Sequence, residues 1–138
     1  MYITDGKDWR NIENGMLIPS EQYTDQPYLL KTDDGAWLCC VTTGSSNEGN
    51  PRQHVITMRS YDQGKTWVEH NELESASSPE SAYSVLLKIP SGRIFAFYNY
   101  NEDNIRHVIA PPDAHQRVDC LACLSRIRGT TIAGHSRH

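Results

Sequence analysis

Three carboxylates lie where this sequence could do acid–base chemistry. Asp25, Glu48 and Glu80 each occur in a polar stretch beside an apolar, strand-forming run. A carboxylate within reach of a substrate oxygen can donate or accept a proton, so these residues are the candidate catalytic acid and base. Each could instead be an ordinary loop charge, because aspartate and glutamate are common in turns and exposed loops.

The same polar stretches contain side chains that could hold a ligand. Tyrosine can stack on the ring of a ligand or be buried against a neighbouring sheet, and amides can hydrogen-bond to hydroxyl groups. Arginine could bind an anionic substituent, although an exposed arginine needs no ligand. His54 could shuttle protons or satisfy a local hydrogen bond. The candidate substrate-binding residues are Gln26, Arg52, Tyr83, Tyr100, Asn101 and Arg106.

Short β-strands in hairpins must position these residues. Two apolar runs, 28–31 and 36–42, flank the dipeptide Asp34-Gly35, which is a strong hairpin signal. A second hairpin follows at 54–60 and 66–69. We therefore expect four short strands and no helix over this part of the chain.

The pattern of the first hairpin recurs later in the chain. Superposing Gly35 on Gly92 gives an offset of 92 − 35 = 57 residues, which also aligns Lys31 with Lys88. A four-stranded unit repeating at this period predicts an all-β protein built from β-propeller blades. An antiparallel sandwich with two similar hairpins is the alternative.

The repeat divides the chain into four parts. Residues 1–24 are an irregular lead-in, 25–80 the first blade, 81–119 a partial second blade and 120–138 an atypical tail. The chain then holds 138/57, or about 2.4, blades, whereas propellers typically have four to eight. We therefore expect an N-terminal fragment of a larger propeller.

Up-and-down topology predicts which residues share one end of the blades. If the first strand of each blade runs from top to bottom, the Asp34-Gly35 turn lies at the bottom and the connection 43–53 lies at the top. The top also receives Asp25, Glu80 and the connection 99–106. Polar loops on a rigid sheet commonly carry binding groups, so all three candidate carboxylates belong to this end.

The turn of the second hairpin contains the motif Ser60-Tyr61-Asp62-Gln63-Gly64-Lys65-Thr66-Trp67. This Ser-x-Asp-x-Gly-x-Thr-Trp pattern resembles the Asp-box, or BNR repeat, of sialidases and related propellers. The aspartate can accept hydrogen bonds from turn amides, the glycine supplies a positive φ, and the hydroxyls pin the strand ends. The tryptophan is expected to bury its ring between sheets. We expect structural roles for Ser60, Asp62, Gly64, Thr66 and Trp67.

The resemblance covers about residues 23–106 and is closest to the sialidase-like glycoside hydrolases with six-bladed propellers. It implies an exo-α-sialidase that removes terminal sialic acid with retention and without a metal or organic cofactor. In that family three arginines hold the sugar carboxylate, an aspartate is the general acid and base, and a tyrosine activated by a glutamate is the nucleophile. The first arginine usually stands in Arg-Ile-Pro. The matching stretch here is Asp25-Gln26-Pro27, whose carboxylate suits a neutral glycan better.

The predicted function is hydrolysis of a terminal glycosidic bond, with a glycan or glycoconjugate as the partner. Two alternatives stay open: a hydrolase for a neutral sugar, and a non-catalytic carbohydrate-binding Asp-box propeller. The chain alone is expected to be inactive, because further blades would carry part of the site. A signal peptide on the parent protein would make it periplasmic or secreted.

The charge balance argues against nucleic acids and membrane surfaces as partners. The chain has 13 Lys+Arg and 17 Asp+Glu, a formal net charge of -4, and no long basic cluster. No apolar run approaches the roughly 20 residues that span a bilayer. Four cysteines are too few to define a disulfide scaffold.

The tail, 120–138, lacks the alternation of the blades and is rich in arginine and histidine. Shifted codons for residues 126–133 permit the Ser-x-Asp opening of an Asp-box, so we hypothesise a frameshift near residue 120. The pairs Cys120/Cys123 and His135/His138 have the spacing of zinc ligands, but no finger-like apolar pattern separates them. We therefore expect no metal site.

Overall fold

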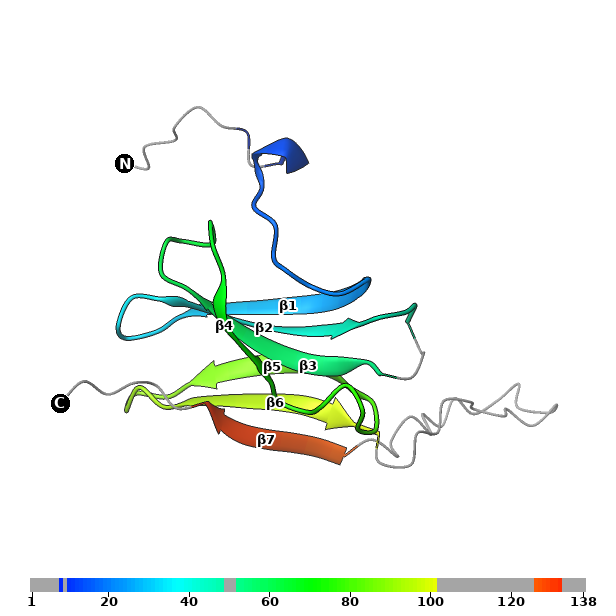
Figure 1. Cartoon of the computed structure of the whole chain (residues 1–138). Helices are drawn as coiled ribbons and strands as arrows, with labels where there is room; N and C mark the ends of the chain where they lie inside the picture. Colours follow the sequence, from blue (N-terminus) through cyan, green and yellow to red (C-terminus); the bar gives the residue numbers. More distant parts are fainter. Residues whose placement is uncertain (1–7, 9, 49–51, 102–125, 133–138) are drawn as a thin grey trace, which may run out of the picture.

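The computed structural model describes residues 8, 10–48, 52–101 and 126–132. These residues form two antiparallel sheets, which lie one above the other in Figure 1, and one short 3-10 helix, η1 (Ile12–Asn14). The first sheet has the order β1-β2-β3-β4 and the second β5-β6-β7. The strands are β1 (Tyr23–Lys31), β2 (Trp37–Gly44), β3 (His54–Ser60), β4 (Val68–Glu72), β5 (Ser81–Lys88), β6 (Ile94–Tyr100) and β7 (Arg126–Ile132). The predicted all-β class is confirmed for this part of the chain, which contains no helix with the length and apolarity to cross a membrane.

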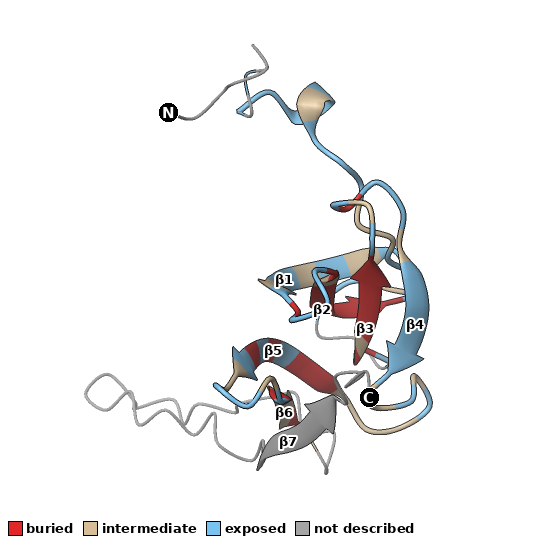
Figure 2. Ribbon diagram, turned by 90° about the vertical axis from the view of Figure 1, so that its left-hand side faces the viewer, coloured by how far each residue is buried: buried red, intermediate tan, exposed pale blue. Residues whose placement is uncertain are grey.

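Burial separates the central strands of the first sheet from its edge. β2 and β3 are buried along almost their whole length, whereas every residue of β4 is exposed, as the colours of Figure 2 show. Continuous burial requires both faces of β2 to be covered, and the apolar run Leu38-Cys39-Cys40-Val41 meets that requirement. β5 and β6 alternate between buried and more exposed residues, so the second sheet is covered mainly on one face.

The 57-residue repeat of the sequence is also a repeat of backbone geometry. Equivalent residues have equivalent strand partners: Asp25↔Thr42 corresponds to Ala82↔Asn99, and Lys31↔Trp37 corresponds to Lys88↔Ile94. Both registers are interrupted at the same place by a bulge, in which Gln26 and Tyr83 have φ of 46° and 56°. The turn glycines Gly35 and Gly92 match as well, with φ of 87° and 80°.

An apolar layer joins the two sheets. Its buried members are Leu38, Cys40, Val55, Leu86, Ile94, Ala96 and Tyr98, with Leu30 and Leu73 packed against them. Hydrogen bonds cross the same interface, since the amide of Tyr83 donates to Thr42 Oγ1 (3.0 Å) and Lys88 Nζ donates to the Lys31 carbonyl (3.3 Å). The second sheet is therefore fixed on the first by both apolar and polar contacts.

The far face of the first sheet is covered by other parts of the chain. Cys39, Val41 and Met58 are fully buried there, against Ile18 of the lead-in and Trp67 of the Asp-box. On the N-terminal side of Ile18, the described lead-in extends away from the sheets to η1 (Figure 1). The lead-in is irregular apart from η1, but β1 already begins at Tyr23.

The tail differs from its sequence pattern at one segment. The sequence predicts no strand in 120–138, yet Arg126–Ile132 forms β7, which pairs antiparallel with β6 from Ile94↔Ile132 to Tyr100↔Arg126. An unpaired β6 edge leaves backbone donors and acceptors without partners, and a segment with several β-branched residues can satisfy them. Pairing with β6 therefore makes this segment a strand although its apolar and polar residues do not alternate.

Candidate functional site

The Asp-box hairpin lies at the end of the sheets that also contains the turns at Gly35 and Gly92, here called the turn end. Asp62 Oδ1 accepts hydrogen bonds from the Ser60 hydroxyl (2.8 Å) and the Thr66 amide (2.8 Å). Asp62 Oδ2 accepts one from the Thr66 hydroxyl (2.7 Å), and Ser60 Oγ accepts one from the Gly64 amide (2.7 Å). Hydrogen bonds from Thr66 and Ser60 lower the pKa of Asp62 to about 2. This carboxylate is therefore fully used in holding its own turn.

Two tryptophans lie beside Gly64 of the Asp-box, whose positive φ favours glycine. Gly64 has φ of 87°, and a Cβ at this position would lie 3.4 Å from the Trp37 ring and 3.6 Å from the Trp67 ring. Trp67 in turn covers the buried group Cys39, Val41 and Met58. The motif thus shapes a turn and also places Trp67 over one face of the first sheet, so its role is structural.

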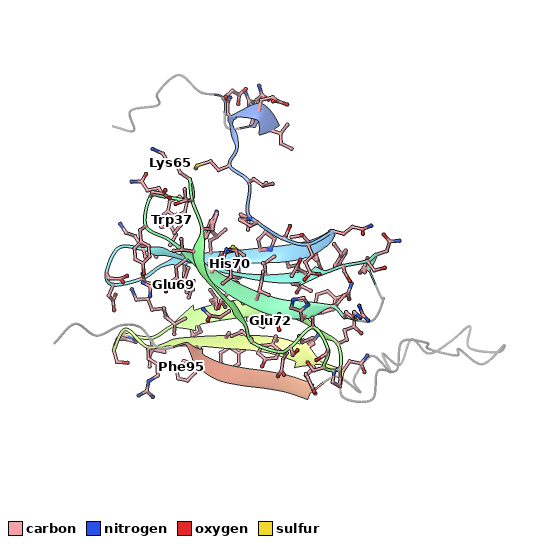
Figure 3. All side chains as sticks on the ribbon, in the orientation of Figure 1. Trp37, Lys65, Glu69, His70, Glu72 and Phe95 are labelled. Atoms are coloured by element: carbon pink, nitrogen blue, oxygen red, sulfur yellow. The ribbon has the colours of Figure 1, made fainter. Side chains whose placement is uncertain are left out.

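A second polar cluster at the turn end was not foreseen from the sequence. Arg59 Nη2 donates to Asp34 Oδ2 (2.6 Å), and its guanidinium lies 5.3 Å from the centre of the Tyr61 ring. The Tyr61 hydroxyl donates to Glu69 Oε1 (2.6 Å), and Glu69 appears at the same end as Trp37 in Figure 3. A buried guanidinium requires such partners. Asp34 and Arg59 are 25 residues apart, so no local pattern pairs them.

At the opposite end, here called the loop end, the three candidate carboxylates gather around two tyrosines. Burial raises the pKa of Tyr83, and so do the charges of Glu48, Asp25 and Glu80. Burial also raises the pKa of Tyr23 to about 12, and the charges of Asp25 and Glu48 act in the same direction. Both hydroxyls therefore stay protonated at neutral pH and can donate hydrogen bonds. We call Tyr23, Asp25, Glu48, Glu80 and Tyr83 the loop-end site.

Tyr23 is the member that sequence reasoning missed. It precedes Asp25 by two residues on β1, and residues two apart on a strand point to the same face. A hydrogen bond between the two side chains contributes to the raised pKa of the tyrosine. The two-residue period of a strand could therefore have predicted that Tyr23 and Asp25 lie side by side.

Two non-glycine residues at the loop end, Gln26 and Tyr83, have a positive φ. Tyr83 and Gln26 occupy the two equivalent bulges with positive φ, a conformation that costs a non-glycine residue about 1–3 kcal/mol. Tyr83 is 45% exposed, and its amide is held by Thr42 Oγ1 (3.0 Å). Gln26 is exposed as well. The bulges therefore present both predicted substrate-binding side chains to solvent at one end of the sheets.

Two other candidates occupy defined places beside the site. Asn101 Nδ2 donates to Glu80 Oε2 (3.2 Å), and the Asn101 amide donates to the Glu80 carbonyl (2.8 Å). Tyr100 is only 7% exposed, so the structure adopts the buried alternative for this ring. Asn101 thus positions a carboxylate, whereas Tyr100 belongs to the protein interior.

The basic candidates do not form part of the loop-end site. Arg52 is exposed, with φ of 78°, and Arg106 lies outside the described residues. His54 is buried, and its Nδ1 lies 2.9 Å from the Arg52 carbonyl oxygen, which is the local hydrogen-bonding role. Within the described part of the chain, the site is therefore acidic and aromatic.

The described residues also bear on metals and thiols. They contain no group of three or more histidine, cysteine, aspartate or glutamate side chains able to hold a metal ion. Burial raises the pKa of Cys39 to about 12 and that of Cys40 to about 11, so both remain unreactive thiols at neutral pH. Cys120, Cys123, His135 and His138 lie outside the described residues.

Comparison with models of known protein families gives no match, and comparison with curated proteins gives none either. The case for a function therefore depends on the motif, the repeat and the loop-end site. Of these, only the loop-end site gathers exposed polar groups that are not consumed in holding a turn.

Proposed function

We propose that this chain is part of a sialidase-like glycoside hydrolase and that its loop-end site binds the terminal sugar of a glycan. One observation carries the proposal: at the end of the sheets opposite the Asp-box, the charges of Asp25 and Glu48 act on both Tyr23 and Tyr83, and that of Glu80 acts on Tyr83. Carboxylate oxygens accept hydrogen bonds from sugar hydroxyls, and tyrosine offers both a ring for stacking and a hydroxyl donor. The repeat and the Asp-box support the family assignment.

Each member of the site has a role in this proposal. Asp25 and Glu48 are the pair for glycosidic chemistry, which needs one carboxylic acid to protonate the leaving oxygen and one carboxylate to assist the attack on the sugar. Tyr23 lies two residues before Asp25 on the same face of β1 and orients its carboxylate. Tyr83 presents its half-exposed ring to the sugar, while Glu80 is held by Asn101 and accepts hydrogen bonds from hydroxyl groups.

The charge of the site bears on the choice of sugar. Asp25, Glu48 and Glu80 bring negative charge to one place, and like charges repel. A neutral terminal sugar would therefore be favoured over a carboxylated one at the described residues. Exo-α-sialidase activity is the activity of the family, so sialosides and neutral glycosides must be tested side by side.

Turnover of fluorogenic glycosides tests the proposal directly. In the larger protein that carries these repeats, Asp25→Asn and Glu48→Gln are each expected to lower kcat by about 100- to 10,000-fold, while the matched change Glu72→Gln on exposed β4 leaves kcat unchanged. Normal turnover in both site variants would remove these residues from the mechanism. Absence of both turnover and sugar binding in the protein that carries these repeats would overturn the proposal.

A non-catalytic carbohydrate-binding protein is the second candidate. The raised pKa values of Tyr23 and Tyr83 favour it, because hydroxyls that stay protonated at neutral pH suit recognition rather than nucleophilic attack. Sugar binding without turnover, measured by calorimetry and lost in Tyr83→Ala, would select this candidate.

A further inference from the structure

The loop-end site draws its side chains from two sheets. Asp25 belongs to β1 of the first sheet, whereas Tyr83 belongs to β5 of the second. The two strands lie in different repeats of the chain, so no single hairpin fixes the position of one side chain relative to the other. The site therefore needs a contact that joins the two sheets at the loop end.

Thr42 of β2 makes such a contact. It is the cross-strand partner of Asp25, and residues directly opposite each other in an antiparallel pair project their side chains to the same face. On that face Thr42 Oγ1 accepts a hydrogen bond from the Tyr83 amide, with 3.0 Å between oxygen and nitrogen. The threonine is 1% exposed, so the bond is shielded from competing water. One buried side chain thus links the strand of Asp25 to the backbone of Tyr83.

The Tyr83 amide lies where the β5–β6 ladder is interrupted. The register passes from Ala82↔Asn99 to Val85↔Phe97, which places Tyr83 in the bulge. A bulge leaves its extra residue out of the ladder and changes the direction of its side chain. Thr42 therefore bonds to the bulge itself, at a residue that is presented to solvent.

Other hydrogen bonds fix the start of β5 without Thr42. The Ser81 amide donates to the Gln53 carbonyl (3.0 Å), and the Val55 amide donates to Ser81 Oγ (3.2 Å). The apolar layer between the two sheets adds to this packing. Loss of the Thr42 acceptor should therefore release the Tyr83 bulge while β5 stays in place on the first sheet.

We propose that Thr42 is a positioning residue of the loop-end site, whose hydroxyl oxygen sets the direction of the Tyr83 ring relative to the Asp25 carboxylate. Its effect on a sugar rests on the proposed function, whereas its hold on the Tyr83 backbone does not. Because the hydroxyl bonds to the residue whose ring meets the sugar, Thr42 governs how tightly the sugar is bound rather than how fast the glycosidic bond is cleaved.

Substitutions at Thr42 and at its neighbour separate this role from general packing. Thr42→Val keeps the shape and removes the acceptor, Thr42→Ala removes the same acceptor with a smaller side chain, and Thr42→Ser keeps the hydroxyl. Thr43 is the matched neighbour because it is also fully buried, but its Oγ1 donates to the Tyr23 carbonyl (2.9 Å) and accepts from the Glu21 amide (2.8 Å). Thr43→Val therefore removes buried hydrogen bonds that do not involve Tyr83.

Hydrogen exchange of the Tyr83 amide, measured by NMR on this chain, tests the contact without any ligand. Thr42→Val and Thr42→Ala should each speed this exchange about tenfold or more relative to the Met58 amide, because local opening of the bulge then exposes the donor. Thr42→Ser and Thr43→Val should leave the ratio within about twofold of wild type. An unchanged ratio in the folded Thr42 variants that lack the acceptor would overturn the proposal, as would an equal rise in Thr43→Val.

A double-mutant cycle in the larger protein that carries these repeats tests the consequence for a sugar. The probes are methylumbelliferyl galactoside and methylumbelliferyl sialoside. For each probe that is cleaved, Thr42→Val should raise KM about 3- to 10-fold with kcat within about twofold, and Thr42→Ser should restore KM. In the Tyr83→Ala background Thr42→Val should have no further effect, because Thr42 acts through the Tyr83 ring.

The two measurements fail in different ways. Additive effects of the two substitutions on KM, or a loss confined to kcat, would contradict a role of Thr42 through Tyr83. A wild-type protein that neither cleaves nor binds either probe would instead defeat the proposed function. In that case the exchange of the Tyr83 amide still decides whether Thr42 holds the bulge.

Discussion

The two sheets share one backbone plan but differ in what covers them. β1–β2 and β5–β6 have the same register, the same bulge and the same glycine turn. The first sheet is covered on one face by the second sheet and on the other by Ile18 and Trp67. The second sheet is covered by the first and leaves Val85 and Leu87 exposed on its other face. The two hairpins thus have the same backbone geometry, but their faces are buried to different extents.

The same comparison explains how the side chains of the loop-end site differ between the repeats. At the equivalent bulges the first sheet has Asp25 and Gln26, whereas the second has Ala82 and Tyr83. The repeat therefore supplies a common scaffold, and divergence of side chains at the same backbone position supplies a site with one carboxylate and one tyrosine from different repeats.

The largest expected difference between the sheets is in the cost of removing an apolar side chain. Met58 is fully buried on the far face of the first sheet. Met58→Ala should therefore lower the free energy of unfolding by about 2–5 kcal/mol. Leu87→Ala on the exposed face of β5 should change it by no more than about 0.5 kcal/mol. Urea unfolding measures both free energies, and equal costs would mean that the exposed face of β5 is covered in the folded chain.

The two turn glycines should respond unequally to alanine. Both have positive φ, which costs alanine about 1–2 kcal/mol. A Cβ at Gly35 meets nothing within 4 Å, whereas one at Gly92 would collide with the Asp33 carboxylate, which pairs with Lys88. Gly92→Ala should therefore be the more destabilising change in thermal unfolding. The reverse order would show that the contact between the two turns does not contribute to stability.

The Asp-box, which only the first repeat has among the described residues, should give the stability a specific pH dependence. The folded pKa of Asp62 is about 2, below its ordinary value of 3.8. A depressed pKa means that the charged form stabilises the fold above pH 3.8 and that this contribution is lost as pH falls towards about 2. Urea midpoints between pH 5 and about 2 should fall more steeply for wild type than for Asp62→Asn. Parallel profiles would contradict the role of the carboxylate.

The smallest effect is expected at the equivalent lysines. Lys88 bonds to Asp33 and to the Lys31 carbonyl, and its side chain is 30% exposed, so Lys88→Met should cost about 0–1 kcal/mol and less in high salt. Lys31→Met is the matched control and should be neutral in a dilute monomer. A cost that does not respond to salt would indicate that the methylene groups of Lys88, and not its charge, hold the turn end.

Local patterns predicted much of the fold and part of the site. The turn signals and the apolar runs placed the first two hairpins within a few residues of β1 to β4, and the repeat placed the third within a few residues of β5 and β6, because strand period and turn chemistry act locally. Asp25, Glu48, Glu80 and Tyr83 were predicted to share one end and do so. β7 was missed because its partner edge on β6, rather than its own alternation, decides that it is a strand. Tyr100 proved to be buried because contacts between strands, which local sequence does not report, cover its ring.

The sequence by itself determined the repeat, the strand positions and the turn chemistry, since these follow from steric rules acting over a few residues. Only the tertiary structure decided which faces are covered, which carboxylates are consumed and which are left to act. Asp62 and Asp25 are both aspartates beside strands, yet Asp62 is saturated by its own hairpin while Asp25 meets Tyr23 and the charges near Tyr83. Burial and electrostatic coupling depend on distances between segments far apart in the chain, and those distances exist only once the sheets have packed.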